Sequence, residues 1–253
     1  MIYINAMRVP TRAAPEFDSG DYTAQLPVVR ALQTMEWFRF RSSVTFFAGE
    51  NGSGKSTLLE ALAVCAGMNA EGGSRNYNFA TNRTESGLHK WLSIARSERE
   101  RDSYFLRAES FYNAASYIDQ LDEIGAAAPP IKGSYGGKSL HAQSHGESFL
   151  ALVQNRLNCG LYILDEPEAA LSPTRQMTLL VEMDRLVRAG SQLVIATHSP
   201  ILLSFPGAEI YELTGDEISL TPYTETTHYQ ITRRFLNDTQ HMLRLLGLEE
   251  EST

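Results

Sequence analysis

The chain has 253 residues, 43% of them hydrophobic and 21% charged, and a mass of 28.2 kDa. This balance is typical of a globular protein and excludes a disordered or collagen-like chain. The 22 basic and 30 acidic side chains give a net charge of −8. A surface with this charge is, taken as a whole, a poor non-specific ligand for nucleic acid or anionic lipid.

The sequence predicts neither a membrane-spanning helix nor a secretory signal peptide. No apolar run approaches the roughly 20 residues that a membrane-spanning helix needs. The first residues lack the charged-then-apolar order of a signal peptide. Cys65 and Cys159 stand far apart and outside any CxxC pair, so neither a disulfide framework nor a zinc site is expected. We therefore expect a cytoplasmic protein with one domain over residues 1–253.

The first 66 residues lead up to a glycine-rich loop. Residues 2–4 have the composition of a strand, and residues 26–40 end in an amphipathic stretch. The apolar, β-rich residues 44–48 predict a strand, and residues 56–66 predict a helix. The order is therefore strand, glycine loop, helix.

The loop between that strand and helix matches the pattern GxxxxGK[ST] at every fixed position, from Gly49 to Ser56. Glycines let the backbone curl so that several N–H groups point at phosphates, and the helix adds its positive end. Lys55 is suited to reach the β- and γ-phosphates, and the Ser56 hydroxyl is suited to bind Mg²⁺. The residues expected to contact the nucleotide here are Gly49, Glu50, Asn51, Gly52, Ser53, Gly54, Lys55, Ser56 and Thr57. The loop predicts a nucleoside triphosphate site.

The middle of the chain has a different composition, rich in Gly, Ser, Asn and charged residues. It contains one predicted strand at residues 104–108, a predicted helix near 114–124 and a glycine- and proline-rich loop at 125–139. Basic residues between Arg75 and Arg107 outnumber acids, and we interpret them as a solvated face rather than a polynucleotide site.

The second half alternates strands with helices, which indicates a parallel sheet. A helical pattern at 146–155 precedes a buried strand at 161–164. A helix starting at Ser172-Pro173 and ending at Gly190 follows, and then a second buried strand at 192–196. Residues 209–213 and 217–221 predict a hairpin, and residues 229–246 predict a helical tail with no chemical signature.

Polar residues follow both buried strands of this half. Asp165 and Glu166 follow the first strand, at the edge where ligands bind in open α/β sheets. Asp165 suits the ordering of Mg²⁺, and Glu166 suits the base that activates the attacking water. His198 follows the second strand, where it is placed to bond the γ-phosphate or that water. Together with the phosphate loop, these residues predict ATP hydrolysis.

With these motifs in place, residues 44–204 resemble the ATP-binding-cassette (ABC) ATPase family. The counterpart of the family's signature motif is QSHGE, which opens a helix 18 residues before Asp165. The resemblance implies that Ser144, Gly146 and Glu147 contact ATP bound by a second copy, so that the active unit is a head-to-tail homodimer. Judged from the residues alone, Ser144 and Glu147 are spaced as a capping box at the start of a helix. The capping box and the signature motif are compatible, so both interpretations can hold together.

The resemblance also implies a fold: a parallel core sheet, an antiparallel β subdomain, and a small helical insertion at residues 67–145 that carries the signature. The family has a glutamine at the end of such a strand, and in this chain Glu109 stands at the corresponding place after the 104–108 strand. The DEPE…LSP sequence that begins at Asp165 is similar to the non-transporter members. The chain is most similar to compact soluble bacterial AAA/ABC ATPases, which are related to chromosome-maintenance and recombination-repair ATPase heads.

The expected activity is Mg²⁺-dependent ATP binding and hydrolysis, which makes the protein an ATP-gated switch on a nucleic-acid or protein partner, for example in repair or phage defence. Two alternatives stay open: the ATP-binding subunit of a membrane transporter, and a module that binds ATP without turning it over. Tyr22 and Phe17 are candidates for stacking on adenine, although plain packing is the stronger expectation for either.

Overall fold

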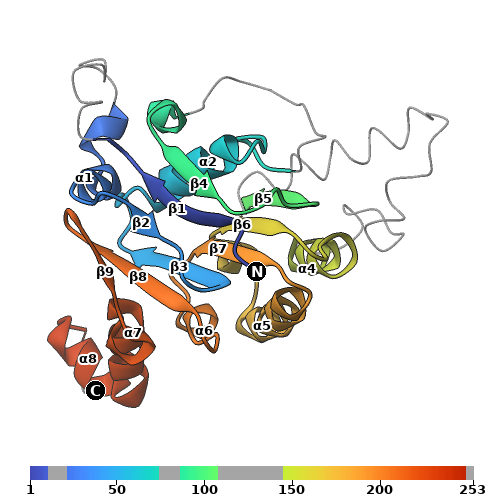
Figure 1. Ribbon diagram of the computed structural model, residues 1–253. Coiled ribbons are helices and arrows are strands. Elements are labelled where there is room, and N and C mark those ends of the chain that lie inside the picture. The colour runs from blue at the N-terminus through green and yellow to red at the C-terminus, as the bar shows by residue number, and fades with distance from the viewer. Residues whose placement is uncertain (11–21, 74–85, 108–144, 249–253) are drawn as a thin grey trace, which may run out of the picture.

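The computed structural model describes residues 1–10, 22–73, 86–107 and 145–248, which form two β-sheets flanked by helices (Figure 1). Over these residues, no helix combines the length and the apolar character needed to cross a membrane. The predicted fold class is confirmed: a mixed α/β fold with a parallel core sheet and a separate antiparallel sheet.

The larger sheet has six strands in the order β5-β6-β7-β3-β8-β9. In that order they are Ser103–Arg107, Leu161–Asp165, Gln192–Ala196, Val44–Gly49, Glu209–Thr214 and Glu217–Leu220. The first five are parallel, and β9 returns antiparallel to β8, as the predicted hairpin requires. Every residue of β3, β6 and β7 is buried, which explains why these strands read as continuous apolar runs.

The smaller sheet is antiparallel, with β1 (Ile4–Arg8) between β2 (Phe38–Arg39) and β4 (Ser93–Arg96). The sequence predicted a strand at residues 2–4, which is wrong in its position. The amides of Tyr3 and Ile4 both donate to Oε1 of Gln192, at 2.8 and 2.9 Å. The Gln192 side chain thus fixes the start of β1 to the core sheet, and the ladder runs on to Arg8.

Helices and the smaller sheet cover the two faces of the core sheet. On one face, α1 (Pro27–Gln33), α2 (Lys55–Cys65) and the smaller sheet pack around Phe47 and Ile163. On the other face, the helices α4, α5 and α6 pack around Phe46 and Leu164. Their bounds are His145–Arg156, Pro173–Arg188 and Pro200–Leu203.

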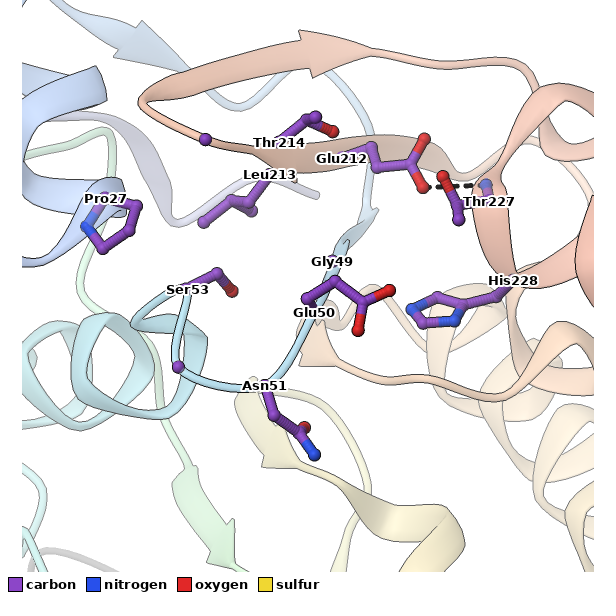
Figure 2. A pocket seen from close by; sticks show the side chains of 12 residues that line it. Pro27, Gly49, Glu50, Asn51, Ser53, Glu212, Leu213, Thr214, Thr227 and His228 are labelled. Carbon is purple, nitrogen blue, oxygen red and sulfur yellow. Dashed lines mark hydrogen bonds between the residues drawn. The ribbon is translucent and has the colours of Figure 1, made fainter.

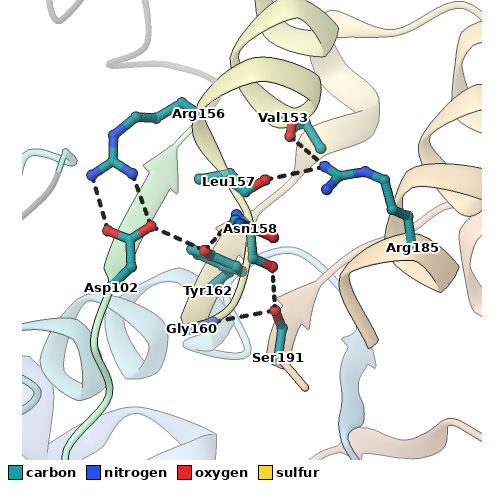
Figure 3. Close-up of polar contacts among 9 residues, drawn as sticks. All are labelled: Asp102, Val153, Arg156, Leu157, Asn158, Gly160, Tyr162, Arg185 and Ser191. Atoms are coloured by element: carbon teal, nitrogen blue, oxygen red, sulfur yellow. Dashed lines mark hydrogen bonds and ion pairs between the residues drawn. The ribbon is translucent and has the colours of Figure 1, made fainter. Parts of the chain in front are cut away.

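A polar network at the carboxyl end of α4 attaches this helix to both sheet and helix neighbours (Figure 3). Arg156 forms two bonds to the Asp102 carboxylate at 2.8 and 2.9 Å, and the Tyr162 hydroxyl donates to the same carboxylate at 3.0 Å. Arg185 of α5 donates to the carbonyl oxygens of Val153 and Leu157. The Arg185 bonds thus satisfy two carbonyl oxygens at and just beyond the end of α4, and the Arg156 bonds tie the same end to Asp102.

The tail forms two helices, α7 (Thr227–Asn237) and α8 (Thr239–Leu245), where the sequence predicted one helical stretch. The break occurs at Asp238, whose side chain accepts from the His241 amide at 3.1 Å and so caps the second helix. Within residues 67–145, the described part supplies β4 and β5 to the two sheets. The helix predicted at 114–124 and the loop at 125–139 lie outside the described residues.

Candidate functional site

The phosphate loop follows β3 directly, and two of its glycines, Gly49 and Gly54, occupy positions where a side chain would not fit. Gly49 has a φ of 140°, and a Cβ there would lie 2.6 Å from the Leu213 carbonyl oxygen. Gly54 has a φ of 93°, and a Cβ there would lie 2.6 Å from Cγ1 of Val28. The loop is therefore held between the end of β8 and the start of α1, and α2 begins at the next residue.

Lys55 lies on the inner side of this loop and is only 4% exposed. Its ammonium donates to the carbonyl oxygens of Gly49 at 2.7 Å and Glu50 at 2.9 Å, and to the Ser53 hydroxyl at 3.3 Å. Burial lowers the pKa of the Lys55 ammonium, and the charges of Glu166 and Asp165 oppose that shift. A buried cation with three donors is thus directed into the loop, and it feels the charge of the acidic pair at the end of β6, two strands away from β3.

The acidic pair lies at the end of β6, as predicted. Asp165 is 5% exposed, and its Oδ2 lies 3.4 Å from Nε of Arg107 at the end of β5. The same guanidinium lies 3.1 Å from Oε2 of Glu60 on α2. Arg107 therefore bridges the acidic strand end to the helix that follows the phosphate loop. Arg107 does not belong to the solvated face that its sequence neighbourhood predicts, because it forms ion pairs with two buried carboxylates.

Glu166 has the backbone of a sharp turn, with φ 49° and ψ 53°. Its amide donates to the Ala196 carbonyl at 3.0 Å, which continues the ladder between β6 and β7 by one residue. Its Oε1 lies 3.5 Å from Nε2 of His198. The turn thus brings the predicted base and the predicted phosphate sensor together at one edge of the sheet.

His198 has three neighbours that set its protonation. Its pKa is lowered by burial first, then by the positive charges of Lys55 and His228, while Glu166 opposes the shift. The lowered pKa favours the uncharged form of the His198 ring at neutral pH. A neutral imidazole can donate through one nitrogen and accept through the other, which suits a contact to phosphate or water.

Two residues near His198 were missed by sequence reasoning. Glu168 accepts a bond from the His198 amide at 2.5 Å, and burial raises the pKa of its carboxyl. His228, the second residue of α7, stacks edge-on against His198 with ring centroids 5.0 Å apart. Glu168 stood in the DEPE sequence but carried no assigned role. His228 lies 30 residues beyond His198 in a tail without a motif, so only the fold reveals it.

Of the predicted signature residues, Gly146 and Glu147 lie in the first turn of α4. A Cβ at Gly146 would lie 2.7 Å from the Ala170 carbonyl oxygen, so α4 approaches the turn after Glu166 closely. Oε1 of Glu147 lies 2.9 Å from Nη2 of Arg175 on α5. Ser144 and Glu109 lie outside the described residues, as does Phe17.

A cavity of about 360 Å³ opens beside the phosphate loop (Figure 2). It is lined by the loop, the end of β8, the start of α1 and the start of α7. The lining residues are Pro27, Gly49, Glu50, Asn51, Gly52, Ser53, Glu212, Leu213, Thr214, Gly215, Thr227 and His228. Tyr22, the described candidate for adenine stacking, is 60% exposed and does not belong to this lining. Ser56 lies in the first turn of α2, beside Thr57.

Two protein-family models match this chain. Residues 141–204 match a model described as "AAA domain, putative AbiEii toxin, Type IV TA system", and residues 29–113 match one described as "AAA domain". The two matches include the phosphate loop, Asp165, Glu166 and His198.

Curated relatives are ATP-binding proteins of importers. Ribose import ATP-binding protein RbsA 2 of Agrobacterium fabrum (strain C58 / ATCC 33970) is 30% identical over 192 residues, which are 67% of this chain and 36% of that protein. Ribose import ATP-binding protein RbsA of Jannaschia sp. (strain CCS1) is 27% identical over 197 residues, 70% of this chain and 37% of that protein. The chain thus spans little more than a third of the length of these relatives.

Solved structures with a similar chain path are more distant. A putative metal-chelate type ABC transporter in an inward-facing conformation has a TM-score of 0.44 at 17% identity, over 77% of this chain and 78% of that chain. The SMC head domain from Thermotoga maritima has a TM-score of 0.37 at 16% identity, over 74% of this chain and 92% of that chain.

Proposed function

We propose that this chain, which carries an ATP-binding domain of the AAA/ABC ATPase type, binds Mg-ATP at the phosphate loop and hydrolyses it to ADP and phosphate. The observation that carries the proposal is the meeting of four groups from three neighbouring strands. Lys55 follows β3, Asp165 and Glu166 follow β6, and His198 follows β7. All four lie at the same edge of the larger sheet. Oε1 of Glu166 lies 3.5 Å from Nε2 of His198, and the charges of Glu166 and Asp165 oppose the lowering of the Lys55 pKa by burial.

The phosphates would bind to the loop amides and Lys55. Curled glycine loops direct N–H groups at phosphate oxygens, and the first turn of α2 adds its positive end. Lys55 donates to loop carbonyls in the described arrangement, and phosphate oxygens would offer it stronger, charge-assisted acceptors. In the adjacent cavity, Pro27 and Leu213 offer apolar contacts, and Thr214 offers a hydroxyl. Its volume of about 360 Å³ suits the base and ribose of the nucleotide.

The oxygen donors of the site fit a magnesium ion. Mg²⁺ prefers carboxylate, hydroxyl, phosphate and water oxygens, and Asp165 and Ser56 supply the first two kinds. When bound, the ion would neutralise the phosphate charge and orient the γ-phosphate. Arg107 beside Asp165 holds that carboxylate at the strand end and at the same time limits its negative charge.

Glu166 would orient and deprotonate the attacking water, and His198 would bond the γ-phosphate or that water. Glu166 is 39% exposed at its side chain, so water reaches it, while His198 is less exposed at 27%. A carboxylate next to a neutral imidazole provides an acceptor for the water's proton and a donor for the developing phosphate charge.

The active unit proposed is a head-to-tail homodimer in which Ser144, Gly146 and Glu147 of one copy approach ATP bound to the other. Gly146 and Glu147 lie in the first turn of α4, and the positive end of a helix dipole favours an anion. ATP would hold the two copies together and hydrolysis would release them, so that the protein acts as a switch on a nucleic-acid or protein partner.

The test is the solution mass of Glu166→Gln with and without Mg-ATP, measured by light scattering. This variant should keep its ATP affinity, stall hydrolysis and double its mass only with ATP. Ser144→Arg in the same background should stay monomeric, and Lys55→Ala should lose ATP binding by about a hundredfold. Turnover at background in the parent protein, unchanged in Glu166→Gln, would refute the ATPase assignment and leave a module that only binds ATP.

A second candidate function is the ATP-binding subunit of a membrane transporter, which the names of the curated relatives favour. The DEPE…LSP sequence and the glutamate at position 109 favour the non-transporter reading. Co-purification of the tagged chain with a membrane permease would reverse this preference. Stimulation of ATP turnover by DNA or RNA would support the first function and identify the class of partner.

A further inference from the structure

The two tail helices form a projecting arm, defined here as residues 227–248. Figure 1 shows α7 and α8 below β8 and β9, projecting from the rest of the molecule. Over residues 227–248, all within the described part of the chain, no side chain is buried. Helices of 11 and 7 residues are marginal in water without a packing surface. The arm therefore has the features of an element that is completed by a partner.

The amino end of the arm is anchored to the body, beside the candidate nucleotide site. Thr226, fully buried, caps α7 by accepting from the Tyr229 amide. The Thr227 amide donates to Oε1 of the buried Glu212 at 2.8 Å (Figure 2). His228 packs against His198. The arm thus leaves the body at the face that carries the phosphate loop.

The arm exposes large aliphatic side chains in unusual density. They are Ile231, Leu236, Leu245, Leu246 and Leu248, each between 57% and 70% exposed. Leu245 and Leu248 are three residues apart, and Gly247 with a φ of 74° ends the helix between them. Single exposed aliphatics are ordinary on a protein surface, but these 18 residues hold five of the ten large hydrophobic side chains that are exposed in the described part of the chain.

The charge of the arm is opposite to that of the body. The arm contains three arginines, Arg233, Arg234 and Arg244, and one acid, Asp238. The last five residues of the chain contain three further glutamates. The body, residues 1–226, therefore holds 19 of the 22 basic and 26 of the 30 acidic side chains, which gives it a net charge of −7. Near the cavity, Glu50 and Glu217 are exposed, and so is Asp216 at the turn between β8 and β9, although Asp216 already pairs with Arg30 at 2.8 Å.

We infer that the arm of one copy packs on the acidic body of a second copy, across the face that carries the nucleotide site. This inference rests on the proposed ATP-dependent homodimer and adds the surface that stabilises it. Apolar side chains flanked by arginines match an acidic protein surface. A nucleic acid is a poorer match, because its phosphates offer nothing to five aliphatic side chains and the body would repel it.

The first experiment measures the dimer dissociation constant of Glu166→Gln with Mg-ATP, alone and with Leu245→Glu plus Leu248→Glu. The arm variant should dimerise at least about tenfold more weakly, because each of the two substitutions removes an apolar contact and adds a negative charge that the acidic body repels. Its affinity for ATP as a monomer should be unchanged. The matched control is Val181→Glu, which replaces an aliphatic side chain that is 68% exposed on α5 and should dimerise like the parent.

The second experiment identifies what the arm touches. A photo-crosslinking residue replaces Gln240, exposed on α8, and isotopically light and heavy copies are mixed before irradiation with Mg-ATP. Adducts that join a light arm to a heavy body are expected. Dimers that yield only adducts within one copy would overturn the inference even if the first experiment showed weaker association.

The outcomes separate the two proposals. If the parent Glu166→Gln protein stays monomeric with ATP bound, the homodimer fails and the inference fails with it. If the parent dimerises and the arm variant dimerises equally well, the homodimer stands and the inference alone is overturned. Loss of binding to a short duplex DNA in the arm variant, with an unchanged dimer, would also overturn it and assign the arm to nucleic acid.

Discussion

Oε1 of Glu166 lies 3.5 Å from Nε2 of His198, and this contact depends on an unusual backbone. Glu166 has φ 49°, the one positive φ at a non-glycine residue in the described part of the chain. The left-handed conformation costs a residue other than glycine about 1–2 kcal/mol. Strain of this kind collects at functional sites, where the surrounding structure enforces it. Here the flanking β6 strand and the bond from the Glu166 amide to Ala196 enforce the turn.

A first prediction follows from this strain. Glu166→Asn should stabilise the fold by about 0.5–1 kcal/mol, because asparagine tolerates the left-handed region better than glutamate. The same change should abolish ATP hydrolysis, because the shorter amide cannot act as a base. Urea unfolding and a phosphate-release assay measure the two effects.

The control for this prediction is Glu36→Asn, at an exposed residue with an ordinary backbone, which should leave stability and turnover nearly unchanged. A Glu166→Asn protein that is less stable than this control would show that the turn carries no strain.

The sequence predicted those parts of the fold that local patterns determine. The order of β3, phosphate loop and α2 could be predicted because glycine spacing and apolar runs act over a few residues. The hairpin of β8 and β9 could be predicted for the same reason, from a Gly215-Asp216 turn between two β-rich runs. The placement of Asp165 and His198 at one edge follows from the rule that carboxyl ends of parallel strands share an edge.

Contacts between distant segments could not be predicted. Arg107 and Asp165 are 58 residues apart, and only the parallel pairing of β5 with β6 brings them opposite each other. The start of β1 depends on the side chain of Gln192, which no pattern near residue 4 reveals. His228 reaches the site because Glu212 and Thr226 fix the start of α7, and this too is a property of the assembled fold.

A second prediction concerns the pH dependence of stability. Burial, Lys55 and His228 lower the folded-state pKa of His198 below its usual 6.5. The unfolded chain therefore binds this proton more readily than the folded protein, so stability rises with pH between the lowered pKa and about 6.5. The parent protein should lose stability as the pH falls from about 7 to about 5.5, and His198→Gln should lose less.

Urea unfolding at several pH values tests this difference between the parent protein and His198→Gln. His241→Gln, which removes an exposed histidine of α8, should retain the parent's dependence on pH. Identical slopes for the parent and His198→Gln would assign the acid sensitivity to other groups.

A third prediction concerns the ion pairs of Arg107. Its guanidinium lies 3.1 Å from Glu60 and 3.4 Å from Asp165, both of which are less than 10% exposed. Arg107→Ala should cost about 2–3 kcal/mol of stability, since it removes a cation from between two buried carboxylates. Arg107→Lys should recover part of the loss, because an ammonium restores the charge and reaches one carboxylate but not both.

The response to added Mg²⁺ distinguishes an electrostatic role of Arg107 from a role in packing alone. Without Arg107 the acidic cluster has one positive charge fewer, so Arg107→Ala should gain more stability from added Mg²⁺ than the parent protein gains. Thermal unfolding with and without MgCl₂ measures the difference. Equal gains in the two proteins would show that Arg107 does not influence the electrostatics of the proposed Mg²⁺ site.

A fourth prediction concerns the close approach of α4 to the turn that follows Glu166. A Cβ at Gly146 would lie 2.7 Å from the Ala170 carbonyl oxygen and 2.8 Å from Nη1 of Arg175. Alanine favours a helix over glycine by up to about 1 kcal/mol, but overpacking a close contact costs about 1–3 kcal/mol. Because backbone oxygen cannot move aside as a side chain can, we expect Gly146→Ala to destabilise the nucleotide-free monomer by about 1–2 kcal/mol.

Urea unfolding without nucleotide measures this cost apart from any role of Gly146 in a dimer. Gln154→Ala, on the exposed side of the same helix, is the control for helix propensity and should be neutral or slightly stabilising. Adding Arg175→Ala to Gly146→Ala should relieve only the side-chain part of the clash and leave the contact with Ala170. A Gly146→Ala protein more stable than the parent would show that α4 can withdraw from this turn. The glycine at position 146 would then be explained by contacts between two copies and not by packing within one copy.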